Sequence, residues 1–176
     1  MTTDQGQQQE VAERVRSYIQ HQASKGPDGI RNAVQKGHDQ LTGLLEGLSD
    51  EQAEFKPAPE EWCVLEVLRH VAGSKRGVAR RCATMSRGEA STNFEPDEEA
   101  PAFASLGEAR EALDDGHQAL LAVIATLTPE TNLEARFDHP FFGPLNSPEW
   151  AAFQRVHDGD HAQQIEQIKS ATGFPA

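Results

Sequence analysis

Apolar residues recur every three or four positions in several stretches of this chain, a spacing that predicts amphipathic helices. Val11, Val15, Tyr18 and Ile19 show it near the N-terminus. No stretch alternates between apolar and polar residues for long enough to predict a strand. The predicted helices cover residues 9–24, about 28–48, 62–86, 106–127 and about 148–171.

Segments that contain residues unfavourable to helices separate these elements. Two prolines in residues 52–61 predict a loop, because proline lacks an N–H and fixes φ. Ser147 followed by Pro148 predicts the cap and first residue of the last helix. The other predicted connections are residues 25–28, 88–105 and 128–147.

The four longer helices predict an all-α fold, a four-helix bundle with an extra N-terminal helical segment. Each has about 20 residues and is therefore about 30 Å long, which suits a bundle. The chain has 176 residues, a length typical of one domain. Residues 1–8 are polar and predict a disordered tail, which leaves residues 9–176 as the domain.

Composition excludes several classes of function. The net charge of −12, from 16 Lys and Arg against 28 Asp and Glu, argues against a nucleic-acid partner, which requires a basic surface. No run of 18 apolar residues predicts a membrane helix, and the polar N-terminus does not resemble a signal peptide. Cys63 and Cys82 are the only cysteines, too few for a disulfide framework, so we expect a cytoplasmic protein.

Three histidines are the strongest candidates for chemistry. His157 and His161 lie in HDGDHAQQI, and a helix brings positions i and i+4 to the same face, with Cβ atoms about 5–6 Å apart. His70 lies in another predicted helix, in WCVLEVLRHVAGS. If His70 faces the pair, three imidazoles can bind a metal and leave an open position, as in catalytic sites. An HxxxH pair alone is a weak signal, since such pairs also occur on helix surfaces.

Charged residues near the histidines allow more than one interpretation. Glu66, one turn before His70, is a candidate fourth ligand, hydrogen-bond acceptor for a ring N–H or general base; alternatively it is a surface charge paired with Arg69. Asp158 and Asp160 are rotated away from the histidine stripe, so they either accept hydrogen bonds from solvent-side groups or lower the local potential. The basic segment 69–87 either pairs with acidic neighbours or binds an anionic ligand. The other histidines are predicted to lie on the surface: His21, His38, His117 and His139.

The chain resembles the DinB-like helical bundle metalloproteins, which include bacillithiol S-transferases and relatives of mycothiol-dependent maleylpyruvate isomerase. The likeness spans about residues 28–170. It rests on LTGLLEGLSDEQAEFKPAPEEWCVLEVLRHVAG, on RVHDGDHAQQIEQIK, and on a histidine followed about ninety residues later by HxxxH.

This resemblance implies an up-down-down-up bundle in which His70, His157 and His161 bind a divalent metal, often zinc or nickel. It also implies a homodimer and a reaction that conjugates or isomerises a small-molecule substrate with a low-molecular-weight thiol. Such thiols often carry carboxylates, so Arg81, with Arg80 or Lys75, is the candidate contact for an anionic thiol.

Two other functions fit the same residues. One is metal-assisted hydrolysis with Glu66 as the base. The other is a bundle stabilised by a structural metal, with the acidic loop 89–99 as a partner-binding surface. A fold hosts many functions, so the bundle alone does not choose among them.

Overall fold

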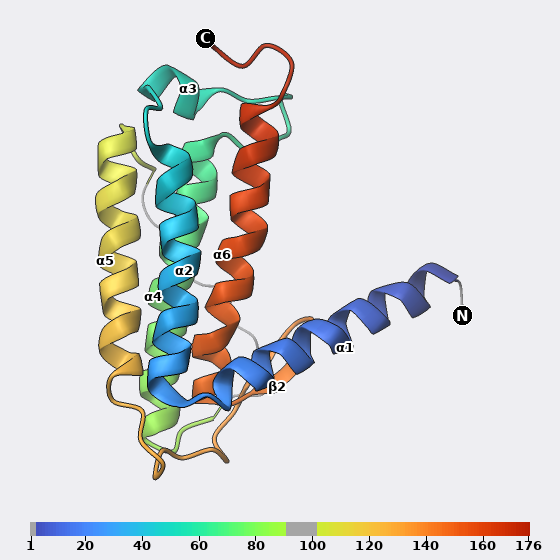
Figure 1. Ribbon diagram of the computed structural model, residues 1–176, viewed down its shortest axis with the longest axis vertical. Coiled ribbons are helices and arrows are strands. Elements are labelled where there is room, and N and C mark those ends of the chain that lie inside the picture. Colours follow the sequence, from blue (N-terminus) through green and yellow to red (C-terminus); the bar gives the residue numbers. More distant parts are fainter. Residues whose placement is uncertain (1–2, 91–101) are drawn as a thin grey trace.

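The computed structural model describes residues 3–90 and 102–176, which include six helices and a short two-stranded hairpin (Figure 1). The predicted acidic loop 89–99 falls largely outside the described residues. The elements are α1 (Thr3–Ala23), α2 (Gly26–Leu45), α3 (Asp50–Glu54), α4 (Val64–Ser86), α5 (Leu106–Ile124), β1 (Phe137–His139), β2 (Gly143–Leu145) and α6 (Ser147–Lys169).

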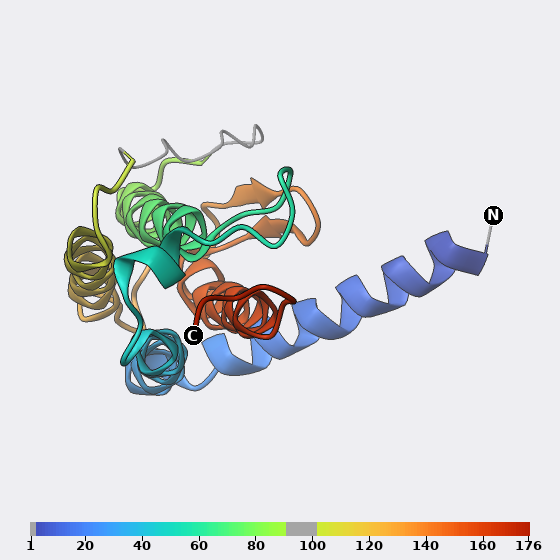
Figure 2. The same ribbon diagram turned by 90° about the horizontal axis from the view of Figure 1, so that it is seen from above.

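Helices α2, α4, α5 and α6 form the predicted four-helix bundle. Helices α2 and α6 run in one direction and α4 and α5 in the other, which is the up-down-down-up order (Figures 1 and 2). Helix α4 packs against both α5 and α6, and α2 packs against α6. The antiparallel pair α4 and α6 therefore shares an interface along which side chains of the two helices can meet.

Local sequence signals explain where the two site-bearing helices begin. At α4, Cys63 and Glu66 form a capping box, and at α6 Asn146 and Glu149 do the same. Each box satisfies backbone N–H groups that have no partner in the first turn of a helix. The cap of α6 is thus Asn146 and not Ser147, one residue before the predicted position.

Two short elements were not predicted. Helix α3 occupies part of the predicted loop, where Ser49 and Gln52 form another capping box. The hairpin pairs β1 with β2 in antiparallel fashion, and its strands of three residues are too short to show alternation in the sequence. The indole N–H of Trp150 donates to the carbonyl of Phe137 and thereby attaches the hairpin to α6.

The core consists of two apolar clusters at different levels of the bundle. One includes Val78 and Met85 of α4, and the other Val67 and Val71 of the same helix. Buried polar residues lie on all four bundle helices between these two levels: His38, Ser74, Lys75, His117, Gln154 and Asp158. The three candidate ligands are at or near the same level as this polar layer.

Helix α1 packs against α6 and α2, and its N-terminal part projects away from the bundle (Figures 1 and 2). Residues 3–8 are helical, where the sequence predicted a disordered tail. In the described ranges, no helix combines the length and the hydropathy needed to cross a bilayer.

Candidate metal centre

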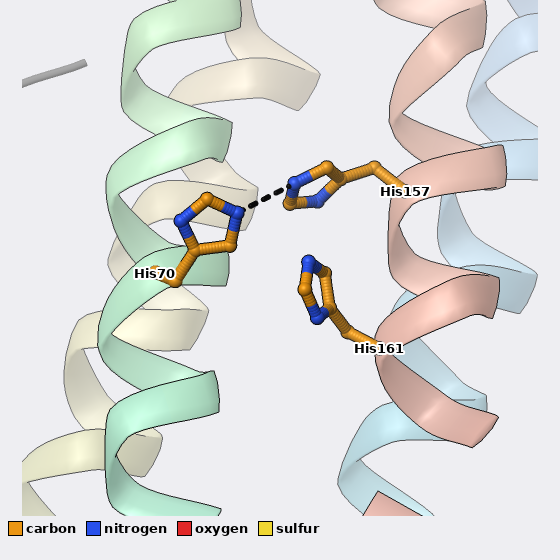
Figure 3. A group of neighbouring side chains, drawn as sticks. All are labelled: His70, His157 and His161. Carbon is orange, nitrogen blue, oxygen red and sulfur yellow. Dashed lines mark hydrogen bonds between the residues drawn. The ribbon is translucent and has the colours of Figure 1, made fainter. Parts of the chain in front are cut away.

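The three predicted ligands converge at the interface of α4 and α6 (Figure 3). One ring nitrogen from each of His70, His157 and His161 lies within 4.8 Å of the other two. The Nε2 atoms of His70 and His157 are 3.0 Å apart. Ring centroids are 4.5 Å apart for His157 and His161, and 4.9–5.0 Å from His70 to each of these rings.

Helix geometry accounts for this convergence. His157 and His161 are one turn apart on α6 and project from the same stripe. His70 lies in the second turn of α4 and meets them across the antiparallel interface. Three imidazoles in this arrangement suit a divalent transition metal and would leave a position free for another ligand. The donor set therefore fits a metal that retains a position for another ligand.

The site opens toward solvent beside an aromatic side chain. Trp62, 40% exposed, has its ring centroid 5.3 Å from that of His70 and stacks on His161 at 6.4 Å. A groove of about 620 Å³ adjoins the site, and both Trp62 and His161 line it. Its other lining residues are Pro57, Glu60, Glu61, Gln164, Gln167, Ile168 and Ala171. A small molecule in this groove would contact His161, one of the three candidate metal ligands.

The environment keeps His157 neutral. Burial, followed by the neighbouring rings of His161 and His70, lowers its pKa well below the ordinary value. An uncharged imidazole is the form that binds a metal. His157 therefore does not have to lose a positive charge before it binds a metal at neutral pH.

A buried ion pair lies behind the histidines. Lys75 Nζ donates to Asp158 Oδ2 at 2.5 Å, and both side chains are fully buried. The amide nitrogen of Gln154 donates to Asp158 Oδ1 at 2.7 Å and lies 3.3 Å from His157 Nδ1. The interpretation that Asp158 accepts hydrogen bonds from solvent-side groups is wrong, because its face of α6 turns into the core. Sequence reasoning gave no role to Gln154, although its position three residues before a ligand was a usable signal.

Glu66 lies in the cap of α4. Its Oε2 accepts from the backbone N–H of Cys63 at 2.8 Å, and its Oε1 accepts from Lys56 Nζ at 2.7 Å. The hydrogen bond from Lys56 is the main cause that lowers the pKa of Glu66. Both carboxylate oxygens thus accept hydrogen bonds outside the histidine cluster, and Glu66 forms an ion pair with Lys56. A role as base stays a prediction.

Arg81 lies on α4, eleven residues after His70, which is about 16 Å along the helix axis. Its side chain is buried, and its guanidinium carbon is 4.9 Å from the centroid of the Trp150 ring. Lys75, the suggested companion, is committed to Asp158. Arg81 as a contact for an anionic thiol also stays a prediction.

Three of the histidines predicted on the surface are buried. His38 and His117 stack with ring centroids 3.9 Å apart, and His139 packs among Phe142, Trp150 and Phe153. Burial lowers the pKa of His117 to about 3 and that of His139 to about 4. The prediction failed because polar partners on other helices, such as Gln35 for His117, do not show in local spacing.

Comparison with known proteins agrees with this architecture. The chain is 28% identical over 143 residues to the uncharacterized protein YuaE of Bacillus subtilis (strain 168), which covers 71% of this chain and 88% of YuaE. The four-helix bundle protein TT2238 superposes with a TM-score of 0.64 and 24% identity, covering 80% of this chain and 98% of TT2238.

Two further solved structures share the fold. YfiT from Bacillus subtilis, described as a probable metal-dependent hydrolase with an unusual four-helix bundle topology, has a TM-score of 0.66, 18% identity and coverage of 85% and 89%. A DinB-like protein from Bacillus cereus has a TM-score of 0.58, 17% identity and coverage of 85% and 95%. The family model for the DinB superfamily matches residues 33–165, and the chain therefore belongs to the DinB superfamily.

Proposed function

We propose that this protein is a metal-dependent enzyme in which His70, His157 and His161 bind one divalent ion, zinc or nickel, and a low-molecular-weight thiol is the co-substrate. The proposal rests on one observation, the three ring nitrogens within 4.8 Å of one another. When bound, such an ion lowers the pKa of a thiol or a water molecule in its open position and so supplies a nucleophile.

The residues around the site would bind and orient the reactants. An electrophile in the groove would lie against the ring of Trp62 and beside His161. Arg81 would contact a thiol carboxylate only if the thiol is extended, given the separation of about 16 Å along α4. S-transfer or isomerisation is the reaction class that the family resemblance favours.

Hydrolysis is the second candidate, because YfiT, which shares the fold, is described as a probable metal-dependent hydrolase. A hydrolase benefits from a free base near the bound water. Glu66 was the predicted base, and here its two oxygens accept from Cys63 and Lys56. A metal-bound water, like a metal-bound thiol, has a lowered pKa, so these contacts of Glu66 do not by themselves exclude hydrolysis. The thiol reaction stays the first candidate because the family resemblance favours it.

The first experiment measures the metal content of untagged protein by plasma mass spectrometry. We expect about one equivalent in the wild type and its loss in His70→Ala, His157→Ala and His161→Ala. His21→Ala, on the exposed part of α1, is the matched control and should retain the metal. Metal that persists in any of the three ligand variants would refute the shared site.

The second experiment separates the two reactions. Metal-loaded protein is mixed with a chromogenic aryl halide and cysteine-containing thiols, and separately with p-nitrophenyl acetate without thiol. The proposal expects thiol-dependent turnover that His161→Ala abolishes. Ester turnover without thiol, reduced in Glu66→Gln, would instead support hydrolysis.

A further inference from the structure

Two glutamines of α6 contact the Nδ1 atoms of the two ligands on that helix, but with opposite hydrogen-bonding groups. Gln164 presents its amide oxygen to His161 Nδ1 at 2.8 Å. Because an amide oxygen only accepts, the proton of His161 is on Nδ1. Its Nε2, which faces the other two histidines in Figure 3, therefore carries a lone pair suited to a metal.

Gln154 does the reverse at His157. Its amide nitrogen lies 3.3 Å from His157 Nδ1, and an amide N–H only donates. The neutral ring must then accept at Nδ1 and carry its proton on Nε2. That Nε2 is 3.0 Å from Nε2 of His70 and donates to it, so a proton occupies the direction in which a metal would need a lone pair.

The amide of Gln154 is held in this orientation by groups of fixed polarity. Its nitrogen is 2.7 Å from Asp158 Oδ1, and the other carboxylate oxygen accepts from Lys75. The hydroxyl of Ser74 lies 3.4 Å from the amide oxygen. Rotation of the amide would place its oxygen against a carboxylate oxygen. Gln154, Lys75 and Asp158 are fully buried, so water does not offset that contact.

We infer that Gln154, oriented by the buried Lys75–Asp158 pair, is a positioning residue that holds His157 in the tautomer opposite to that of His161 and so weakens the affinity of the site for divalent metals. The statement about metal affinity rests on the proposed function, whereas the statement about tautomers concerns the metal-free protein. Each is tested separately.

The tautomers are measured by long-range ¹H–¹⁵N correlation spectra of chelator-treated protein at about pH 8, which is above the ordinary pKa of a histidine side chain. We expect His157 as the Nε2–H form and His161 as the Nδ1–H form. Gln154→Leu, which lacks the donor, should shift His157 toward the Nδ1–H form. An Nδ1–H form of His157 in the wild type would overturn the inference.

Affinity for Zn²⁺ is measured by competition with a chromophoric chelator. We expect Gln154→Leu to bind zinc about tenfold more tightly and the matched variant Gln164→Leu about tenfold more weakly, within the range that residues contacting metal ligands usually contribute. Gln154→Met, also without a donor, replaces the leucine variant if that one does not fold. Unchanged or weaker binding by the Gln154 variant would overturn the statement about affinity. Absence of zinc binding in the wild type would overturn that statement and the proposed function, while the spectra still decide the tautomers.

Discussion

Breaking the Lys75–Asp158 pair should destabilise the protein more than any surface ion pair. Both side chains are fully buried, and the two charged atoms are 2.5 Å apart. Asp158→Asn leaves an ammonium group in the core without its counter-ion, and Lys75→Met leaves a carboxylate there. Removing one partner of a buried pair typically costs about 3–5 kcal/mol, because the remaining charge is neither solvated nor paired.

The double variant Lys75→Met/Asp158→Asn should lose much less than the sum of the two single variants, because neither charge then remains in the core. Urea unfolding followed by circular dichroism, with a chelator present, gives the four free energies of unfolding. In a chain of this size, 3–5 kcal/mol corresponds to a fall in melting temperature of about 6–20 °C.

The surface pair Arg87–Glu89 is the control, because its side chains are about 60% exposed although its atoms are 2.8 Å apart. Exposed pairs contribute about 0–1 kcal/mol, so Glu89→Gln should have little effect. The reasoning would be refuted if the single variants at Lys75 and Asp158 cost as little as this control, or if their costs were simply additive.

Two more predictions concern the polar layer and its packing. His117 has a pKa of about 3 in the folded protein and about 6.5 when unfolded, so the unfolded chain binds more protons between these values. Its contribution to stability should be complete above about pH 6.5 and be lost as the pH falls toward 3. Free energies of unfolding in urea, measured over this pH range, should depend less on pH for His117→Gln than for the wild type. An equal dependence in the two proteins would contradict this. Gly116→Ala should cost about 1–3 kcal/mol, because a Cβ there would lie 3.0 Å from the carbonyl oxygen of Ala72. Gly43→Ala, with no atom within 4 Å of the added Cβ, should instead stabilise the protein by up to about 1 kcal/mol, and equal effects in thermal melts would refute the close contact.

The bundle could be predicted because the signals for each of its helices lie within that stretch of sequence. Apolar spacing and Pro/Gly breaks gave four long helices whose observed bounds differ from the predicted ones by a few residues. The strands of the hairpin and helix α3 are too short for periodicity to register, and their stability comes from contacts such as that between Trp150 and Phe137. The helical state of residues 3–8 was missed because this polar segment has no apolar stripe.

The ligand set was predictable for a different reason. His157 and His161 share a face through helix geometry alone, but nothing local links them to His70. That link came from resemblance to a family. Likewise, the capping role of Glu66 could be inferred from its position three residues after Cys63, whereas its ion pair with Lys56 depends on how the preceding loop folds back.

The position of the buried pair follows from the angle between neighbouring residues on a helix. Successive residues of an α-helix are rotated by about 100° about the helix axis. Asp158 therefore points about 100° away from His157, and Lys75, five residues after His70, points about 140° away from His70. When the ligand faces of α4 and α6 meet at the open side of their interface, these two side chains both turn toward the core. Placing the histidines thus brings the lysine and the aspartate together, and Gln154 contacts both the pair and a ligand. A change at Lys75 or Asp158 should therefore affect the metal site through Gln154 even though neither residue is a ligand.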